Sequence, residues 1–308
     1  MPSQARKMRV ALAIASYDGD PSANALALQA SATDLRDCFS QVAIIDSGDP
    51  SRCLALAQSL AEVDAPVEYR RHEGNLGSAG NLVARLRWGD EVGADALMAV
   101  NADGVLDDAN VRVMIELLRG TQSGAVYPTH VIDGGRVDLS CLRPVPVLPS
   151  RAPLARLAGR EALEVRWGSS NGALYRLSAI RGLDLDAIAA LWYGWEDLSV
   201  GVGLERLGHR QLMSVTAQQP TRADQKHLAR THLVVSSKAP WTTYYGVRNL
   251  MLIARRFPAS SLRVVLRIIR EFVMILLRDH RSKRYRYATR GLLDGIRGVT
   301  GQRVRPIS

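Results

Sequence analysis

The sequence predicts an α/β fold with a mostly parallel central sheet flanked by helices. Three observations predict it: short apolar runs alternate with helical stretches, the connections between them are short, and polar residues stand where the apolar runs end. With 308 residues, 47% of them hydrophobic and 23% charged, the chain has the length and composition of a globular protein. Global disorder is excluded, and one large or two modest domains are expected.

The first half of the chain alternates between strand and helix patterns. VALAIAS and VAIID are short apolar runs, as expected for strands buried on both faces. Pro21 is a helix start signal, and SGDPS after the second run is a turn. The predicted strands are Val10 to Ser16, Val42 to Asp46, Val67 to Arg70 and Ala96 to Val100, and the predicted helices are Ala23 to Phe39, Cys53 to Val63 and Asn81 to Val92.

The second half has a weaker pattern. From Pro128 to Glu164 the chain is rich in proline and lacks periodicity, which predicts a long irregular excursion. A strand at Gly172 to Tyr175 and helices at Ile180 to Ala190 and Trp195 to Leu207 are expected next. The expected division is a body over 1–246, whose pattern changes at about residue 127, and a basic amphipathic helical region over 247–308.

Positive charge is concentrated in the C-terminal region. Residues 247–308 contain 15 Lys and Arg against 3 Asp and Glu, a net +12, whereas residues 1–246 contain 25 against 27, a net −2. Arg263, Arg267 and Arg270 share one helix face. Such a helix either contacts an anionic membrane surface or packs on the body of the protein with its arginines in solvent. A nucleic-acid partner is not expected, because the body is near neutral and carries acids at strand ends.

The cysteines and the N-terminal sequence indicate the compartment. Cys38, Cys53 and Cys141 are odd in number and widely spaced, which fits neither a disulfide framework nor a zinc site. MPSQARKMRV lacks the apolar core of a signal peptide, and no stretch approaches the ~20 apolar residues that span a bilayer. We expect a cytoplasmic protein, either free or peripheral at the inner face of the plasma membrane.

The first candidate motif is Asn101-Ala102-Asp103, directly after the run ALMAV. A carboxylate at the end of a buried strand is held rigidly at the ligand crevice of an α/β sheet. Its oxygens suit Mg²⁺ or Mn²⁺, which are commonly shared with substrate phosphates. The alternative is that Asp103 and Asp107 only cap the next helix.

The second candidate motif is the loop GNLGSAGN, from Gly74 to Asn81. Glycines allow close approach of the backbone to a ligand, and a helix N-terminus favours anions. The glycine spacing fits neither the dinucleotide fingerprint nor a P-loop. The alternative is a plain turn between a strand and a helix.

Two further motifs lie in the second half. Trp195-Glu196-Asp197 opens a helix, where the helix dipole favours acids in any case. The functional interpretation is that one carboxylate takes a proton from an acceptor hydroxyl. WGSSNG, from Trp167 to Gly172, either leaves room for a substrate or forms a surface turn.

Taken in this order, the four motifs resemble the family 2 glycosyltransferases, most closely the bacterial rhamnosyltransferase-like branch. The resemblance covers nearly the whole chain. It is carried by IASYDGD, IIDSGDPS, NLGSAGN, VNADG, WGSSNGALY, YGWEDLSVGVGLERLGHR, WTTYYGVRNLMLIARRFP and ATRGLLDGIRGVTGQ.

The resemblance implies a GT-A fold with a C-terminal helical extension over 247–308 and a role in polysaccharide biosynthesis. Residues 1–246 would be the catalytic domain, with a nucleotide-binding half of about 1–127 and an acceptor half of about 128–246. It implies inverting transfer of a hexose from a UDP- or dTDP-linked donor, assisted by Mg²⁺ or Mn²⁺. The acceptor would be a hydroxyl of a glycan, a lipid-linked molecule or a small molecule.

The same resemblance assigns residues. Asp197 would be the catalytic base with Glu196 beside it, and Asp103 would bind the metal together with His227 or, alternatively, His232. The implied donor-side residues are Ala15, Ser16, Tyr17, Asp46, Asn75, Gly77, Asn101, Ala102 and Asp103, and the implied acceptor-side residues are Trp167, Gly168, Ser169, Asn171 and Trp195.

The chain also departs from the family pattern. Asn101 stands where the family's metal motif usually has an acid, and Ser199 and Gly203 replace an Asp and an Arg that often follow the Glu-Asp pair. A nucleotide-sugar-binding protein with weak catalysis is one alternative on this ground. A sugar nucleotidyltransferase is another, but it would need a cationic glycine-rich loop after the first strand, and SYDGDPSAN carries no cation.

Overall fold

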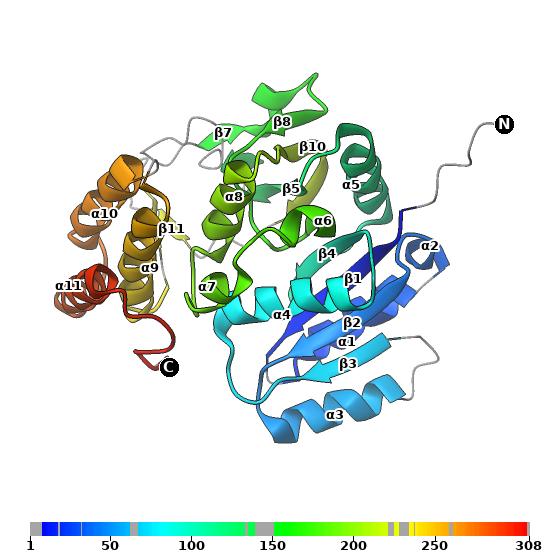
Figure 1. Ribbon diagram of the computed structural model, residues 1–308, viewed down its shortest axis with the longest axis horizontal. Coiled ribbons are helices and arrows are strands. Elements are labelled where there is room, and N and C mark those ends of the chain that lie inside the picture. The colour runs from blue at the N-terminus through cyan, green and yellow to red at the C-terminus, as the bar shows by residue number, and fades with distance from the viewer. Residues whose placement is uncertain are drawn as a thin grey trace.

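A mixed β-sheet forms the centre of the computed structural model, which describes residues 8–17, 19–31, 33–61, 67–132, 135–138, 151–220, 225–227, 234–236, 238–258 and 261–306. Within these residues the strand order is β3-β2-β1-β4-β9-β5-β10-β8, with β6 and β7 added beside β5, and helices cover both faces (Figure 1). The strands are β1 (Val10–Ser16), β2 (Gln41–Asp46), β3 (Val67–Arg71), β4 (Ala96–Asn101), β5 (Ala125–Ile132), β6 (Arg136–Asp138), β7 (Arg151–Pro153), β8 (Ala162–Glu164), β9 (Ala173–Arg176) and β10 (Gln211–Pro220), and a separate ribbon pairs β11 (Gln225–His227) with β12 (Val234–Ser236).

The parallel strands bring the motif residues to one edge of the sheet. In the register of β1 with β2, Ser16 pairs with Asp46, and in that of β1 with β4, Ala15 pairs with Asn101. Strand β9 then inserts antiparallel between β4 and β5 and begins at this same edge, so Asn171 in the loop before it lies beside Asn101. The expected gathering of polar residues at the carboxyl ends of the strands is confirmed.

The alternation of side chains along β1 divides the core into two layers. Ala11 and Ala13 pack with Leu82 and Leu86 on one face, whereas Leu12 packs on the other. Helices α4 (Gly77–Glu91), α6 (Leu177–Ile180), α7 (Leu185–Ala189) and α8 (Glu196–Arg206) cover the first face, and α1 (Pro21–Ser31), α2 (Thr33–Arg36), α3 (Pro50–Ala61) and α5 (Asp108–Thr121) cover the second.

Three predictions about elements are wrong. The helix expected at 23–39 is two helices, α1 and α2. The helix expected at 180–190 is also divided, because Oδ1 of Asp184 accepts a 3.0 Å hydrogen bond from the Ala187 amide and so starts a new helix, α7. The excursion expected at 128–164 contains β6, β7, β8 and the 3₁₀ helix η1 (Leu154–Leu157), whose strands form through pairing with distant segments rather than through a local pattern.

Three long helices close the chain and lie together at one side of the molecule (left in Figure 1): α9 (Thr242–Arg256), α10 (Ser261–Ile275) and α11 (Arg281–Arg297). Val247, Leu250 and Ile253 of α9 form a core with Val264 and Ile268 of α10. None of the helices among the described residues is long and apolar enough to cross a membrane.

Arg267 of α10 faces inward, which corrects the expectation that the arginines of this helix line its outer face. Arg267 is buried, with its guanidinium carbon 5.1 Å from the ring centre of Trp195 and 5.8 Å from that of Trp167. Two aromatic faces stabilise this buried cation, so Arg267 turns toward the segments that carry Trp167 and Trp195 and leaves the outer face to apolar residues.

Candidate active site

The end of β1 provides a buried, unsatisfied polar group. Ser16 is buried, and its hydroxyl has no hydrogen-bond partner among the described residues. Ala15 lies just before it in the register with Asn101, and the ring of Tyr17 after it is about half exposed. A buried hydroxyl without a partner is expected where a ligand supplies one.

Asp46 is fully buried at the end of β2. Its Oδ1 accepts from the Gly48 amide at 2.9 Å, and its Oδ2 accepts from the hydroxyl of Tyr69 at 3.0 Å. Burial first, and then hydrogen bonds to Cys53 and Asp46, raise the pKa of Tyr69, so it stays a donor. Asp46 thus shapes the loop after β2, and its contact with a nucleoside stays a prediction.

The glycine loop docks on the segment before α8. Oδ1 of Asn75 accepts from the Gly77 amide at 2.7 Å, and Nε1 of Trp192 donates to the Asn75 carbonyl at 3.2 Å. Gly77 has φ +66°, and a Cβ there would lie 2.0 Å from the carbonyl oxygen of Trp192. The amide of Gly194 donates to Oγ of Ser78 at 3.2 Å. Only glycine fits at position 77, because the two loops touch backbone to backbone.

The motif at the end of β4 is held by the WGSSNG loop. The amide of Asn101 donates to Oδ1 of Asn171 at 2.9 Å, and the amide of Gly104 donates to the carbonyl of Asn101 at 2.9 Å. This turn leaves Ala102 partly exposed and Asp103 exposed. The carboxylate of Asp103 is therefore open to a ligand at the edge of the sheet, and a role limited to helix capping does not apply, since Asp107 caps α5 through the Asn110 amide.

Asp197 lies on the other side of the same loop. It is half-buried in the first turn of α8, and its Oδ1 accepts from the backbone amide of Ser170 at 3.1 Å. Ser170 and Asn171 are neighbours, so one short loop connects the end of β4 to Asp197. Loss of hydration first, and then the negative charge of Glu196, raise the pKa of Asp197 to about 7. A carboxylate with that pKa suits proton transfer at neutral pH.

Glu196 is buried beside Asp197. Its Oε2 has no hydrogen-bond partner among the described residues, and burial raises the pKa of this carboxyl group. A hydrogen bond from Ser78 of the glycine loop acts in the opposite direction. Trp195, directly before the pair, has φ +66° and therefore turns the chain sharply into α8. This turn brings two acids to one site, where they repel one another.

A buried cation balances the two acids, and the sequence motifs did not reveal it. Arg85 of α4 is buried, and its Nη1 donates to the carbonyl of Val100 at 3.1 Å. Burial lowers the pKa of Arg85 to about 10, while Tyr175, Asp197 and Glu196 act in the opposite direction. The available signal was a charged residue among apolar neighbours on the inward face of α4, which includes Leu82 and Leu86.

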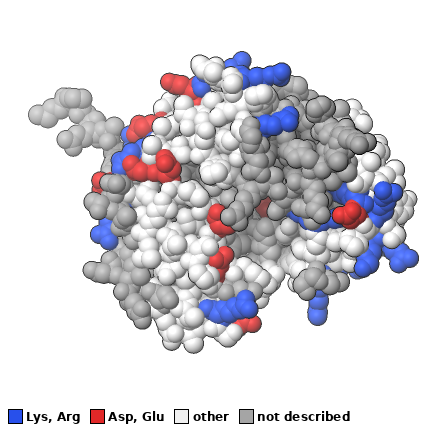
Figure 2. All heavy atoms as spheres, turned by 180° about the vertical axis from the view of Figure 1, so that it is seen from behind, with Lys and Arg blue, Asp and Glu red and all other residues white. Residues whose placement is uncertain are grey.

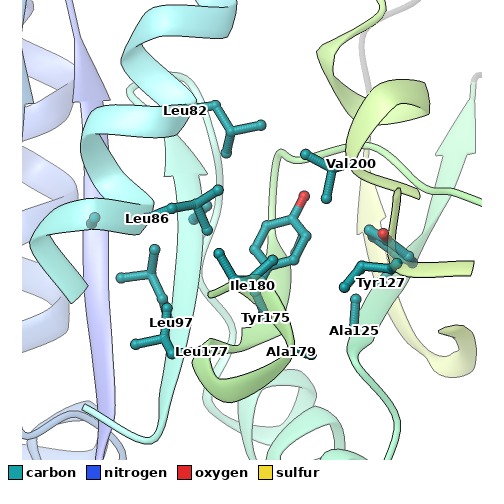
Figure 3. Close-up of a cluster of buried hydrophobic side chains, with 14 of the residues drawn as sticks. Leu82, Leu86, Leu97, Ala125, Tyr127, Tyr175, Leu177, Ala179, Ile180 and Val200 are labelled. Atoms are coloured by element: carbon teal, nitrogen blue, oxygen red, sulfur yellow. The ribbon is translucent and has the colours of Figure 1, made fainter. Parts of the chain in front are cut away.

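Tyr175 of β9 lies in the same buried region. Figure 3 shows its hydroxyl pointing toward Val200 of α8, with Leu82 and Leu86 of α4 on one side of the ring. This hydroxyl has no hydrogen-bond partner among the described residues, and burial raises its pKa well above the ordinary value. The charges of Asp197 and Glu196 act on Tyr175 in the same direction as its burial.

Aromatic side chains hold the acceptor-side residues. Trp167 and Trp195 meet edge to face with ring centres 6.4 Å apart, and Nε1 of Trp195 donates to the Gly246 carbonyl of α9 at 2.9 Å. Gly168 lies against Tyr127, since a Cβ there would come within 2.2 Å of the ring. Nε1 of Trp167 is buried without a partner among the described residues, and Oγ of Ser169 accepts from the Asn171 amide at 3.3 Å. Ser170, within the same loop, contacts Asp197, and the assignment of these five residues to an acceptor stays a prediction.

The C-terminal helices also fix the segment before α8. Nδ2 of Asn249 donates to the carbonyls of Leu191, Tyr193 and Gly194, at 3.1, 2.8 and 2.9 Å. The neighbouring Arg248 is fully buried and donates to the Leu191 carbonyl at 2.6 Å. The segment that delivers the two acids is thus held by α9, a contact that no local pattern in the sequence predicts.

Of the predicted metal ligands, the side chain of Asp103 is the one that the structure describes. No group of three His, Cys, Asp or Glu side chains that could hold a metal occurs among the residues described. His227 ends β11, and its side chain is not described, while His232 lies outside the described residues. Asp103 therefore offers a single protein oxygen ligand, which fits a cation that takes its other ligands from substrate phosphates and water.

These features define a class: an α/β protein with polar residues at the carboxyl ends of parallel strands and two buried or half-buried acids joined to them through one loop. The sequence profile of Glycosyl transferase family 2 matches residues 23–180, half of the chain. The chain belongs to this family. The undecaprenyl-phosphate mannosyltransferase of Micrococcus luteus is 26% identical over 184 residues, which cover 57% of this chain and 71% of that enzyme.

Solved structures share the fold. TarS of S. aureus (residues 1–349, in complex with UDP-GlcNAc) has a TM-score of 0.58 at 13% identity, and the match covers 95% of this chain and 82% of that one. GalNAc-T7 with UDP, GalNAc and Mn²⁺ has a TM-score of 0.59 at 12% identity, over 82% of this chain. The match spans 48% of the GalNAc-T7 chain, about half of its length. The predicted GT-A fold is confirmed.

Proposed function

We propose that the protein is an inverting hexosyltransferase of the rhamnosyltransferase-like branch, with Asp197 as its catalytic base. One observation carries the proposal: Ser170 and Asn171, adjacent in one loop, bind Asp197 and Asn101. The base is thereby fixed to the strand end at which a nucleotide sugar binds in this family. Fixed geometry between base and donor is what a displacement reaction needs.

The proposed chemistry is a single displacement. Asp197 removes the proton from an acceptor hydroxyl as the oxygen attacks the anomeric carbon of the donor sugar. The bond to the diphosphate breaks on the opposite side, so the configuration inverts and a nucleoside diphosphate leaves. Burial and the charge of Glu196 raise the pKa of the base, and the charge of Arg85 lowers it. Base assistance of this kind contributes about 10²–10⁴ in rate.

The donor is proposed to be a UDP- or dTDP-linked sugar at the ends of β1, β2 and β4. The unsatisfied hydroxyl of Ser16 and the partly exposed Asn75 and Gly77 support this location. Mg²⁺ or Mn²⁺, held by Asp103 and the diphosphate, would neutralise charge on the leaving group. The likeness to structures solved with UDP, and in one case with Mn²⁺, supports both parts of the proposal.

The acceptor is proposed to be a hydroxyl of a glycan or of a lipid-linked molecule, reached between Trp167 and Trp195. The Micrococcus luteus relative, named for a lipid phosphate, supports the lipid-linked class. We place the reaction in the cytoplasm, at the inner face of the plasma membrane.

Binding and turnover of donors test this proposal. Thermal unfolding with UDP- and dTDP-sugars, each with and without Mn²⁺, should reveal a donor that raises the Tm, because a ligand bound only to the folded state stabilises it. Release of nucleoside diphosphate from that donor should follow. Asp103→Ala should remove the Mn²⁺-dependent part of the Tm shift, with Asp107→Ala as the matched control. If no nucleotide sugar binds, or one binds and is never cleaved with any glycan or lipid acceptor, the proposed function is wrong.

A further inference from the structure

Helix α10 exposes an apolar face that the fold does not use. Its inner residues Val264, Ile268 and Ile275 are buried against α9, so the core is already complete. On the outer face, Leu262 is 72% exposed, Ile269 54% and Leu276, just after the helix, 61%. Together with Val265, Leu266 and Val273, these residues recur every three or four positions and form what we call the α10 apolar face.

The concentration of apolar residues here is unlike the rest of the described surface. Elsewhere in the catalytic part, large exposed apolar side chains such as Leu28, Leu54 and Val105 stand on separate elements. Scattered residues of that kind are ordinary, whereas a contiguous apolar face marks an interaction site.

An apolar groove of about 470 Å³ adjoins this face. It lies between the three C-terminal helices and has no polar residue in its lining, which is made of Met251, Val265, Ile268, Ile269, Phe272, Val273 and Leu292. Such a lining cannot satisfy a sugar or a phosphate, but it can accept a hydrocarbon chain.

Positive charge borders the apolar face. Arg281, Lys283 and Arg286 are exposed at the start of α11, within ten residues of Leu276. Between residues 261 and 306, Asp279 is the one exposed acid. Lys and Arg side chains gather on the side of the molecule that these helices form (right in Figure 2). These basic side chains, which we call the positive rim, are therefore complementary to an anionic surface.

We propose that the α10 apolar face docks on a bilayer that contains anionic lipids, with the groove taking a lipid chain. The helix has 15 residues and is too short to span a bilayer, but an amphipathic helix of this kind lies in the plane of the interface. A second copy of the chain is the weaker candidate, because a symmetric contact would bring two positive rims together.

Docking in this orientation would set the active site beside the lipid surface. Arg267, on the inner side of the same helix, contacts Trp167 and Trp195 next to Asp197. This consequence rests on the proposed function, since it gives a lipid-linked acceptor a direct path to the base. Membrane docking itself needs no catalysis and can be tested separately.

Vesicle co-sedimentation of the full chain, without donor or acceptor, tests the inference. The protein should sediment with vesicles of phosphatidylcholine and phosphatidylglycerol and stay largely in solution with phosphatidylcholine alone. Ile269→Asp combined with Leu276→Asp should lower the partition at least about tenfold, and Lys283→Glu combined with Arg286→Glu at least about fivefold. Leu54→Asp changes a residue that is 61% exposed on α3 and should have no effect.

Two results would overturn the proposal. One is a protein that stays in solution with both kinds of vesicle; the other is a Leu54 variant that loses as much binding as the α10 variant. If the wild type is a dimer that the α10 variant converts to a monomer, and neither binds vesicles, a second copy covers the face. Thermal unfolding of each variant checks that the fold is intact. Normal docking with no glycosyl transfer would defeat the proposed function and leave this inference standing.

Discussion

The backbone amide of Ser170 donates a 3.1 Å hydrogen bond to Oδ1 of Asp197. The next residue, Asn171, accepts a 2.9 Å bond from the amide of Asn101. Base and strand end are therefore connected through two adjacent residues, although Asp197 and Asn101 lie far apart in the sequence. The side chain of Ser170 also hydrogen-bonds to Asp197, so the backbone and the side chain of one residue hold this carboxyl group.

The rate of glycosyl transfer should depend on the ionisation of Asp197. Burial and the charge of Glu196 raise the pKa of Asp197 to about 7, and only the ionised form accepts a proton. We expect kcat to be low at pH 5, to rise about tenfold per pH unit below the pKa, and to level off above about pH 8. Initial rates at saturating donor and acceptor measure this. A rate independent of pH between 5 and 8 would show that another group is the base.

Arg85 should lower the pKa of Asp197. Its positive charge favours the ionised form of Asp197, so Arg85→Met should move the rising limb of the pH profile to higher pH. Arg87→Met, on the exposed surface of the same helix, is the matched control and should leave the profile unchanged. A lower rate with an unmoved profile would mean that Arg85 acts through packing alone.

The free energy of unfolding should also depend on the ionisation of Asp197. The pKa of Asp197 rises from 3.8 in the unfolded chain to about 7 in the fold, so the folded state binds the additional proton between these values. Stability contributed by this group therefore falls as pH rises through that window, and the full penalty is present above about pH 7. Asp197→Asn should raise the Tm by about 2–5 °C at pH 8 and by less at pH 5. An equal gain at both pH values would contradict the assignment of the shift.

Gly77 should be intolerant of a side chain. In Gly77→Ala the new Cβ would lie 2.0 Å from the carbonyl of Trp192, at a backbone φ of +66°. We expect a loss of about 2–4 kcal/mol in the free energy of unfolding and weaker donor binding. Gly74→Ala carries the strain alone, since φ is +74° there and nothing lies within 4 Å, so its cost should be about 1 kcal/mol. Equal losses in urea unfolding would show that the contact with Trp192 is not the cause.

The sequence predicted the parts of the fold that have local signatures. The apolar runs at Val10 and Val42 form β1 and β2, and the polar residues after them reach the same edge because parallel strands end together. Helix α8 lies within a residue of its expected bounds, since Gly208 follows its end. The order of the four motifs led to the family.

What the sequence did not reveal depends on contacts between distant segments. Strand β9 takes its place between β4 and β5 by pairing with both of them. Its own residues do not indicate whether it pairs parallel or antiparallel with them. Asn249 holds a segment more than fifty residues before it, and Arg267 turns inward because two tryptophans from other elements receive it. The division at residue 246 stays a prediction, although α9 contacts the catalytic part closely.

Comparison of Asp197→Asn with the wild type tests the central claim most directly. Asparagine keeps the size of the side chain and an oxygen that can accept from Ser170, but it cannot take a proton at neutral pH. At saturating donor and acceptor we expect turnover to fall about 10²–10⁴-fold, with the Kd of the donor within about twofold of the wild type. Turnover close to that of the wild type, with the donor bound normally, would show that Asp197 is not the base.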